Sequence, residues 1–236
     1  MASALTLPES TFSSANPMHA IYLHGFGSSP KTAKGVALGE RLGRALTSYH
    51  IPDLDGGDFS GMTMHSILDR AQAAVRAIPD DGKPVLLIGS SLGGYTAAQL
   101  AAEGRAERVA GLLLIAPAFG FTTRWSERLG PAGISAWQRH GSLPFYHFAA
   151  ERELPLGVGF YESCLTLPEL PGPAKIPVTI IHGRQDETVD HRFSVTYATQ
   201  REQVELHLID GDHRLTEPRH EELIAWSARD LLTRCT

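Results

Sequence analysis

Short apolar runs alternate with longer helical patterns along most of the chain, and this alternation constrains the fold more than any other feature. Two weaker strands are expected at 204–209, on the edge side of a sheet, and at 49–54, where Pro52 removes a hydrogen-bond donor. Four stronger runs are β-branched or leucine-rich, are bounded by Gly or Pro, and predict buried strands: "HAIYLH" (19–24), "VLLIGS" (85–90), "VAGLLLIAP" (109–117) and "VTIIHG" (178–183).

Helical patterns fill the intervals between these strands. Strands that are separated by helices favour a mainly parallel sheet with helices on both faces. We therefore expect one α/β domain over residues 19–236, built on a doubly wound sheet. The helical stretches are "TAKGVALGERLGRAL" (32–46), "MHSILDRAQAAVRAI" (64–78), "YTAAQLAAEG" (95–104), "DHRFSVTYATQRE" (190–202) and "EPRHEELIAWSARDLL" (217–232).

Length and charge exclude several classes of protein. The 236 residues are enough to bury one large core, and the 42% hydrophobic content is ordinary for a globular protein. A net charge of −5 argues against binding to a nucleic-acid backbone, which requires a basic face. The chain has no run of about 18 apolar residues, so no transmembrane helix is expected.

The first 18 residues, "MASALTLPESTFSSANPM", carry neither a basic region nor a continuous apolar region. We expect a flexible N-terminal segment over 1–18 and no secretory signal. Their serine content leaves a transit peptide as an alternative, although arginine is absent. The two cysteines, Cys164 and Cys235, are far apart, so no disulfide framework is expected and a cytoplasmic location is favoured.

The stretch "GSSLG" (89–93) has the pattern G-x-S-x-G centred on Ser91 and not on Ser90. It directly follows a predicted strand and precedes an alanine-rich helix, which is the context of a nucleophile elbow. Glycines are needed at 89 and 93 because larger side chains would collide across the strained turn. A plain strand-to-helix turn without chemical function is the alternative interpretation.

A serine hydroxyl needs a base, and an acid followed by a histidine is expected later in the chain. Asp186 in "HGRQDETVD" and His213 in "GDHRL" each come just after a predicted strand. Both side chains would then project from the carboxyl ends of strands, as Ser91 does. In this interpretation Ser91 attacks, His213 transfers the proton, and Asp186 orients the imidazole and stabilises its charged form.

Other acids and histidines in the sequence are alternatives to this pair. Asp190, four residues after Asp186, is the alternative acid, whereas the aspartates that flank His213 are interpreted as turn formers. Histidines in loops are most often only solvated or hydrogen-bonded. The remaining histidines that were considered lack the sequence context of a base: His24, His140, His147 and His182.

The glycine-rich stretch "YLHGFGSSPKTAKG" (22–35) follows the first predicted strand. A sharp backbone turn there would present the N–H of Phe26, and the N–H of Leu92 would be the second donor of an oxyanion hole. The stretch lacks the G-x-G-x-x-G and P-loop patterns of phosphate-binding loops. No C-x-x-C or H-E-x-x-H pattern occurs, so the sequence implies neither a metal nor a cofactor.

Residues 119–161 interrupt the strand–helix rhythm without a strand signal, yet they contain nine of the eighteen aromatic residues. A disordered linker would be poor in aromatics. We therefore predict a short helical cap insertion over about 119–165, with Phe119, Trp137 and Phe145 in the substrate pocket. The alternative is a peripheral insertion whose aromatics fill only its own small core.

Taken together, the stretches "YLHGFGSSPKTAKG", "IGSSLGGYTAAQLA", "HGRQDETVD" and "GDHRL" resemble the α/β-hydrolase superfamily. Within it, the chain is similar to small bacterial YqiA-like esterases and to mitochondrial acyl-protein thioesterases. The similarity extends over roughly residues 20–232. It places the family's nucleophile, acid and base on Ser91, Asp186 and His213, and its oxyanion donors on Phe26 and Leu92.

The sequence therefore predicts a serine carboxylesterase that works through an acyl-enzyme, without a cofactor, on a small-molecule ester. A thioesterase that removes long fatty chains from protein cysteines is the first alternative. A binding protein on the same fold is the second, but it would not need all three residues of the triad. An acyltransferase or a cofactor-free haloperoxidase would share these residues as well.

Overall fold

The computed structural model describes residues 17–235, and its core is a six-stranded parallel sheet. The flexible segment that was expected over 1–18 lies almost wholly outside the described residues, and Met18 is already a fully buried strand residue. The strands, in spatial order, are β2 (Leu46–His50), β1 (Met18–Leu23), β3 (Val85–Ser90), β4 (Val109–Ile115), β7 (Val178–Gly183) and β8 (Val204–Ile209).

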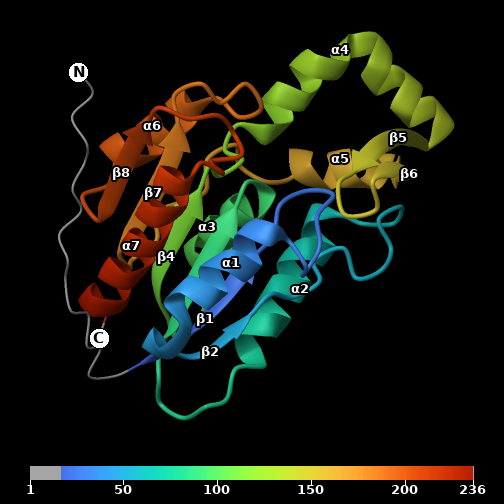
Figure 1. Ribbon diagram of the computed structural model, residues 1–236. Coiled ribbons are helices and arrows are strands. Elements are labelled where there is room, and N and C mark those ends of the chain that lie inside the picture. Colours follow the sequence, from blue (N-terminus) through green and yellow to red (C-terminus); the bar gives the residue numbers. More distant parts are fainter. Residues whose placement is uncertain (1–16, 236) are drawn as a thin grey trace.

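Helices cover both faces of this sheet (Figure 1). One face packs against α1 (Ala33–Leu42) and α7 (Pro218–Arg234). The other face packs against α2 (Met64–Arg76), α3 (Leu92–Ala102) and α6 (His191–Thr199). The central strands β1, β3, β4 and β7 are buried on both sides, which explains why their sequences are continuously apolar rather than alternating. The predicted α/β class and doubly wound sheet are confirmed.

The second predicted strand is displaced along the chain. Helix α1 ends at Leu42, where Gly43 adopts a positive φ of 41°, and a 3₁₀ turn over Gly43–Ala45 leads directly into β2. The helix was predicted to continue to residue 46 and the strand to begin at 49. Both expectations were wrong by a few residues because Gly43 ends the helix early, and β2 closes before Pro52.

The insertion between β4 and β7 forms a cap beyond the carboxyl ends of the strands (Figure 1). It contains α4 (Phe121–His140), which kinks at Gly130 before Pro131, and α5 (Val158–Leu165). Between them lies an antiparallel hairpin of β5 (Ser142–His147) and β6 (Arg152–Gly157). The insertion thus contains the helices that were expected and, in addition, a hairpin that was not.

Sequence analysis missed the hairpin because each of its strands contains a proline. In the structure Pro144 lies directly opposite Pro155. Proline has no N–H to donate and is compatible only with edge strands, so it argued against a strand in both segments. A two-stranded ribbon consists only of edge strands and tolerates the pair. Within residues 17–235, no helix is long and apolar enough to cross a membrane. The cytoplasmic location stays a prediction.

Candidate active site

Ser91 lies at the junction between β3 and α3 in a strained conformation. Its φ of 53° and ψ of −117° are unusual for a residue with a side chain. The backbone fixes this conformation, since Ser91 N donates to Ile115 O at 2.9 Å and Ala118 N donates to Ser91 O at 2.9 Å. The turn therefore presents the hydroxyl at the carboxyl edge of the sheet, as the elbow interpretation requires.

The two glycines around the serine are needed for the reason that the sequence suggested. A Cβ atom at Gly89 would collide with the carbonyl of Gly93, and one at Gly93 would collide with the carbonyl of Leu23. Gly25 is also close, because a Cβ there would lie 3.3 Å from the Cβ of Ser91. The elbow and the loop after β1 are thus packed backbone to backbone.

His213 connects the serine to the acid. Its Nε2 lies 3.1 Å from Ser91 Oγ, and its Nδ1 lies 2.7 Å from Asp186 Oδ2. Because a carboxylate can only accept, Nδ1 carries the proton and Nε2 is left to accept from the serine hydroxyl. The structure therefore brings together the three residues that were selected from the sequence, on three separate loops at one edge of the sheet.

Asp186 is held as a carboxylate. Burial opposes its ionisation, but hydrogen bonds from His182 and His213 outweigh that effect and hold the pKa of Asp186 well below its usual range. Its other oxygen, Oδ1, accepts from Val189 N at 2.8 Å and from Thr188 N at 2.9 Å. The side chain is fully buried, so its charge acts mainly on the two histidines.

The alternative acids have structural tasks. Asp190 is the N-cap of α6, where its Oδ1 accepts from Arg192 N at 2.9 Å. Asp212 accepts from the backbone N–H groups of Arg214 and Leu215, each at 3.0 Å, which is the turn-forming role expected from the sequence. Asp210, the other flanking aspartate, is mostly exposed.

Both expected oxyanion donors lie beside the serine. Leu92 is the first residue of α3, and the first amides of a helix have no partner within the helix. Phe26 follows Gly25 in the loop after β1, and its ring packs among Phe59, Trp125, Phe145 and Phe160. The aromatic cluster therefore fixes the position of the loop whose N–H would contact the substrate oxygen.

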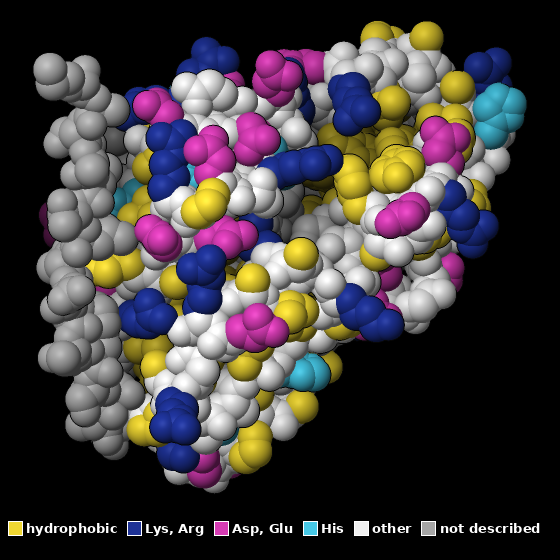
Figure 2. Space-filling model, viewed as in Figure 1, with side chains coloured by type: hydrophobic (Ala, Val, Ile, Leu, Met, Phe, Trp, Pro, Cys, Tyr) yellow, Lys and Arg dark blue, Asp and Glu magenta, His cyan; other side chains and the backbone are white. Residues whose placement is uncertain are grey.

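A cavity of about 1100 Å³ opens in front of Ser91 and His213. Figure 2 shows the hollow beneath α4, with hydrophobic side chains gathered on its wall. The aromatic residues that line it come from the cap and the body: Phe26, Phe119, Phe121, Trp125, Phe145, Tyr146 and Phe148. Polar side chains also line it, including Ser28, Thr32, Lys34, Gln185 and Arg214. The rings form an aromatic compartment of the cavity, and the polar side chains of the lining form its polar compartment.

Of the three residues that were expected in the substrate pocket, Phe119 and Phe145 line this cavity, whereas Trp137 does not. Trp137 is fully buried and lies behind the cavity wall, with its ring centroid 5.0 Å from that of Phe145. Its indole N–H donates to Leu156 O at 2.9 Å, which fastens α4 to β6. Composition placed an aromatic residue in the cap but did not show which rings line the cavity and which are buried behind it.

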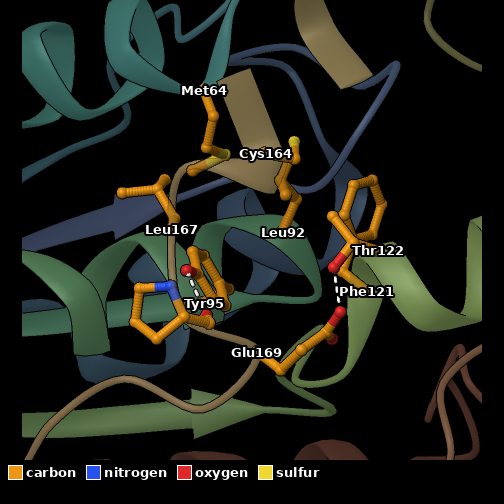
Figure 3. A pocket seen from close by; sticks show the side chains of 9 residues that line it. Met64, Leu92, Tyr95, Phe121, Thr122, Cys164, Leu167 and Glu169 are labelled. Atoms are coloured by element: carbon orange, nitrogen blue, oxygen red, sulfur yellow. Dashed lines mark hydrogen bonds between the residues drawn. The ribbon is translucent and has the colours of Figure 1, made fainter. Parts of the chain in front are cut away.

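The start of the cap is secured by a buried carboxylate. Figure 3 shows Glu169 reaching the first turn of α4, where it accepts from the hydroxyl of Thr122 and, at 2.9 Å, from Thr123 N. A negative charge is favourable at a helix N-terminus. The adjoining cavity measures only about 10 Å³, so it has room for no more than a water molecule. This region anchors the start of the cap.

Two residues of the site were not identified from the sequence. His182, which was set aside for lack of context, donates a second hydrogen bond to Asp186. Its position one residue before the glycine that ends β7, and four before the acid, was the available signal. Lys34 lines the cavity, and burial lowers the pKa of its ammonium to about 8. Among the described residues, no cluster of His, Cys, Asp or Glu is arranged to hold a metal ion.

The comparisons with known proteins agree with this architecture. A model of the uncharacterised protein family UPF0227 matches residues 19–226. The chain belongs to this family. It is also 28% identical over 233 residues to the mitochondrial palmitoyl-protein thioesterase ABHD10 of Mus musculus, covering 90% of this chain and 74% of that protein.

Solved structures show the same fold. The mouse alpha/beta hydrolase domain-containing protein 10 superimposes with a TM-score of 0.75 at 23% identity, over 92% of this chain and 90% of that one. Est1E from Butyrivibrio proteoclasticus, solved with ferulic acid bound, gives a TM-score of 0.76 at 22% identity, over 93% and 90%. This member of UPF0227 therefore has the α/β-hydrolase fold.

Proposed function

We propose that this protein is a serine hydrolase that cleaves carboxylic esters or thioesters through an acyl-enzyme. The observation that carries the proposal is the hydrogen bonding of His213 to both Ser91 and Asp186, next to a cavity of acyl-chain size. A serine that is strained, exposed to a cavity and bonded to an oriented imidazole meets the requirements for a nucleophile.

The reaction follows from the geometry. Ser91 Oγ attacks the carbonyl carbon while its proton passes to His213 Nε2, and Asp186 stabilises the imidazolium that forms. The oxygen that becomes negative is stabilised by the N–H groups of Leu92 and Phe26. His213 then returns the proton to the departing alcohol or thiol, which leaves an acyl group on Ser91. Water, activated by the same histidine, releases the acid and restores the serine.

The aromatic compartment supports an apolar acyl group as the preferred substrate part. Its rings come from both the cap and the oxyanion loop, so an acyl chain would lie between them. The polar compartment would accommodate the alcohol or thiol that leaves. Our first candidate activity is a carboxylesterase on small-molecule esters.

A thioesterase that acts on long fatty acyl groups is the second candidate. The size of the cavity favours it, because about 1100 Å³ exceeds what a short acyl group fills. The similarity to a protein named as a palmitoyl-protein thioesterase points in the same direction. Both candidates use the same residues and differ only in the leaving group and the chain length.

The test combines labelling with turnover on the full chain. A fluorophosphonate probe should label the parent protein and the Ser90→Ala variant, whereas Ser91→Ala should remain unlabelled. Turnover is then measured on p-nitrophenyl esters from acetyl to palmitoyl and on the matching acyl thioesters. A protein that is folded but neither labels nor turns over any member of the panel would show that the chain is a binding protein and not a hydrolase.

A further inference from the structure

The carboxylate of Asp186 accepts four hydrogen bonds, and two of them come from histidines that share one oxygen. His213 Nδ1 lies 2.7 Å from Oδ2, and His182 Nε2 lies 3.0 Å from the same atom. Resting on the proposed function, we propose that His182 is a positioning residue of the active site. It fixes Asp186 Oδ2 in place and limits the negative charge that this oxygen offers to His213.

The hydrogen-bond pattern determines which nitrogen of His182 carries the proton. Asp186 can only accept, so Nε2 of His182 is the donor. Nδ1 lies 2.8 Å from Ser194 Oγ in α6, and it accepts from that hydroxyl when the ring is neutral. His182 is fully buried in β7, so water does not compete for either nitrogen. Asp186 therefore sets the tautomer of His182, as it does that of His213, and Ser194 holds the orientation of the His182 ring.

These hydrogen bonds connect Asp186, a loop residue, to strand β7. Asp186 lies three residues beyond Gly183, the last residue of β7, whereas His182 belongs to the strand itself. A Cβ atom at Gly183 would collide with the carbonyl of Gly211, so the acid loop and the loop that carries His213 are pressed together there. Within residues 17–235, the side chain of His182 hydrogen-bonds only to Asp186 and Ser194, and it is not among the residues that line the cavity. Its action on the reaction therefore passes through Asp186.

Sharing one oxygen has an electrostatic consequence. A hydrogen bond from His182 takes up part of the accepting capacity of Oδ2, so the imidazolium formed on His213 is stabilised less than by an unshared carboxylate. Removing the donor should strengthen the remaining bond to His213. The acid limb of the kcat/KM profile should then move to higher pH, because protonated His213 becomes harder to discharge.

The charged neighbours of both histidines remain the same in the variants used below. Around His213 these are Asp212 and Arg214 of its own loop, Glu187 of the acid loop and Lys34 of α1. The ring of His191 in α6 lies 6.4 Å from that of His182, between centroids. A change in the pH profile can therefore be assigned to the lost hydrogen bond.

Three variants of the full chain separate the hydrogen bond from the volume of the ring. His182→Phe keeps a ring but loses the donor, His182→Gln keeps an amide donor, and Ser194→Ala removes only the hydroxyl that orients the His182 ring. On p-nitrophenyl acetate, His182→Phe should lose about tenfold or more in kcat with little change in KM, because a carboxylate that is no longer held in place orients His213 poorly, and this loss outweighs the stronger bond to His213. His182→Gln should recover most of the rate and the parent pH profile.

Ser194→Ala should show a smaller loss, of about a few-fold, with the acid limb displaced in the same direction. If His182→Phe does not fold, the comparison of Ser194→Ala with His182→Gln carries the same test. A folded His182→Phe with the parent kcat and the parent pH profile would overturn the proposal. So would a His182→Gln variant as impaired as His182→Phe.

A spectroscopic measurement is independent of activity. The parent should give two downfield proton resonances from ring N–H groups bonded to Asp186. In His182→Phe one of them should vanish and that of His213 should move further downfield, while an unchanged His213 resonance would overturn the proposal. A parent that shows both resonances yet neither labels nor turns over esters would disprove only the serine-hydrolase function.

Discussion

The three catalytic loops and the cap meet at the same cavity but are held by different forces. The loops depend on backbone geometry: a strained Ser91, glycines that admit no Cβ atom, and a carboxylate whose every acceptor site is used. The cap depends on rings that pack on rings, such as Trp125 stacked on Phe145 with centroids 4.8 Å apart. The first arrangement tolerates almost no substitution, whereas the second can be repacked. The positions of Ser91, Asp186 and His213 are therefore fixed closely, whereas the shape of the cap can adjust.

The largest effect should come from the acid. Asp186→Asn preserves shape but offers an N–H where His213 needs an acceptor, so kcat should fall by about 10⁴-fold. Asp190→Asn is the matched control four residues away, and asparagine caps a helix as well as aspartate does. Turnover of p-nitrophenyl acetate measures both. If Asp190→Asn were as inactive as Asp186→Asn, the assignment of the acid to Asp186 alone would not stand.

The next effect tests whether the cap relies on packing alone. Trp137→Ala removes a fully buried ring and the donor to Leu156, and should lower the free energy of unfolding by about 3–5 kcal/mol. Phe148→Ala, at a side chain that is 57% exposed, should change it by less than about 0.5 kcal/mol. Chemical denaturation gives both values. Equal changes in the two variants would contradict the distinction between Trp137 as core and Phe148 as rim.

Lys34 should lower the free energy of unfolding, because its ammonium is partly buried in the cavity wall. Lys34→Met removes a half-buried ammonium from the cavity wall and should stabilise the fold by about 1–2 kcal/mol at pH 7. In the parent the folded pKa is about 8 and the model value is 10.5, so the unfolded chain binds more protons between these limits. The stability of the parent should therefore rise with pH from about 8 to 10.5.

The gap between parent and Lys34→Met should accordingly narrow over that range, as measured by thermal unfolding at several pH values. Lys31→Met, at an exposed lysine in the turn just before α1, is the control, and its difference from the parent should not change with pH. A gap for Lys34→Met that is constant across the range would show that its ammonium carries no burial penalty.

The smallest effect concerns the choice of acyl chain. Each methylene buried against the aromatic compartment should contribute up to ~0.8 kcal/mol, so kcat/KM should rise several-fold per CH₂ until the compartment is full. Phe145→Ala enlarges the compartment and should move the optimum to longer chains, with the smallest change on acetyl esters. Val36→Ala, on the exposed side of α1, serves as control. A flat profile in the parent and in Phe145→Ala would mean that the cap is only structural.

The contrast between loops and cap also separates what the sequence could predict from what it could not. Ser91 and His213 were identifiable because each follows a predicted strand, and strand ends in a parallel sheet meet at one edge. His182 was set aside because it lies inside a strand, and the sequence does not show that its ring reaches the carboxylate in the following loop. That Trp125 and not Trp137 lines the cavity, and that Pro144 pairs with Pro155, are features of the three-dimensional packing.

A backbone hydrogen bond joins the two regions close to the expected oxyanion hole. Ala149 N, in the turn between β5 and β6, donates to Gly27 O at 3.2 Å, directly after the expected oxyanion donor Phe26. Gly27 has a φ of 60°, and a Cβ there would lie 3.1 Å from Tyr146 O, so a larger residue would push the hairpin away. The cap is therefore not an exchangeable module. A chimaera that takes its cap from a relative would also need the oxyanion loop of that relative. Chain-length preference and activation of the carbonyl group would therefore have to be transferred together.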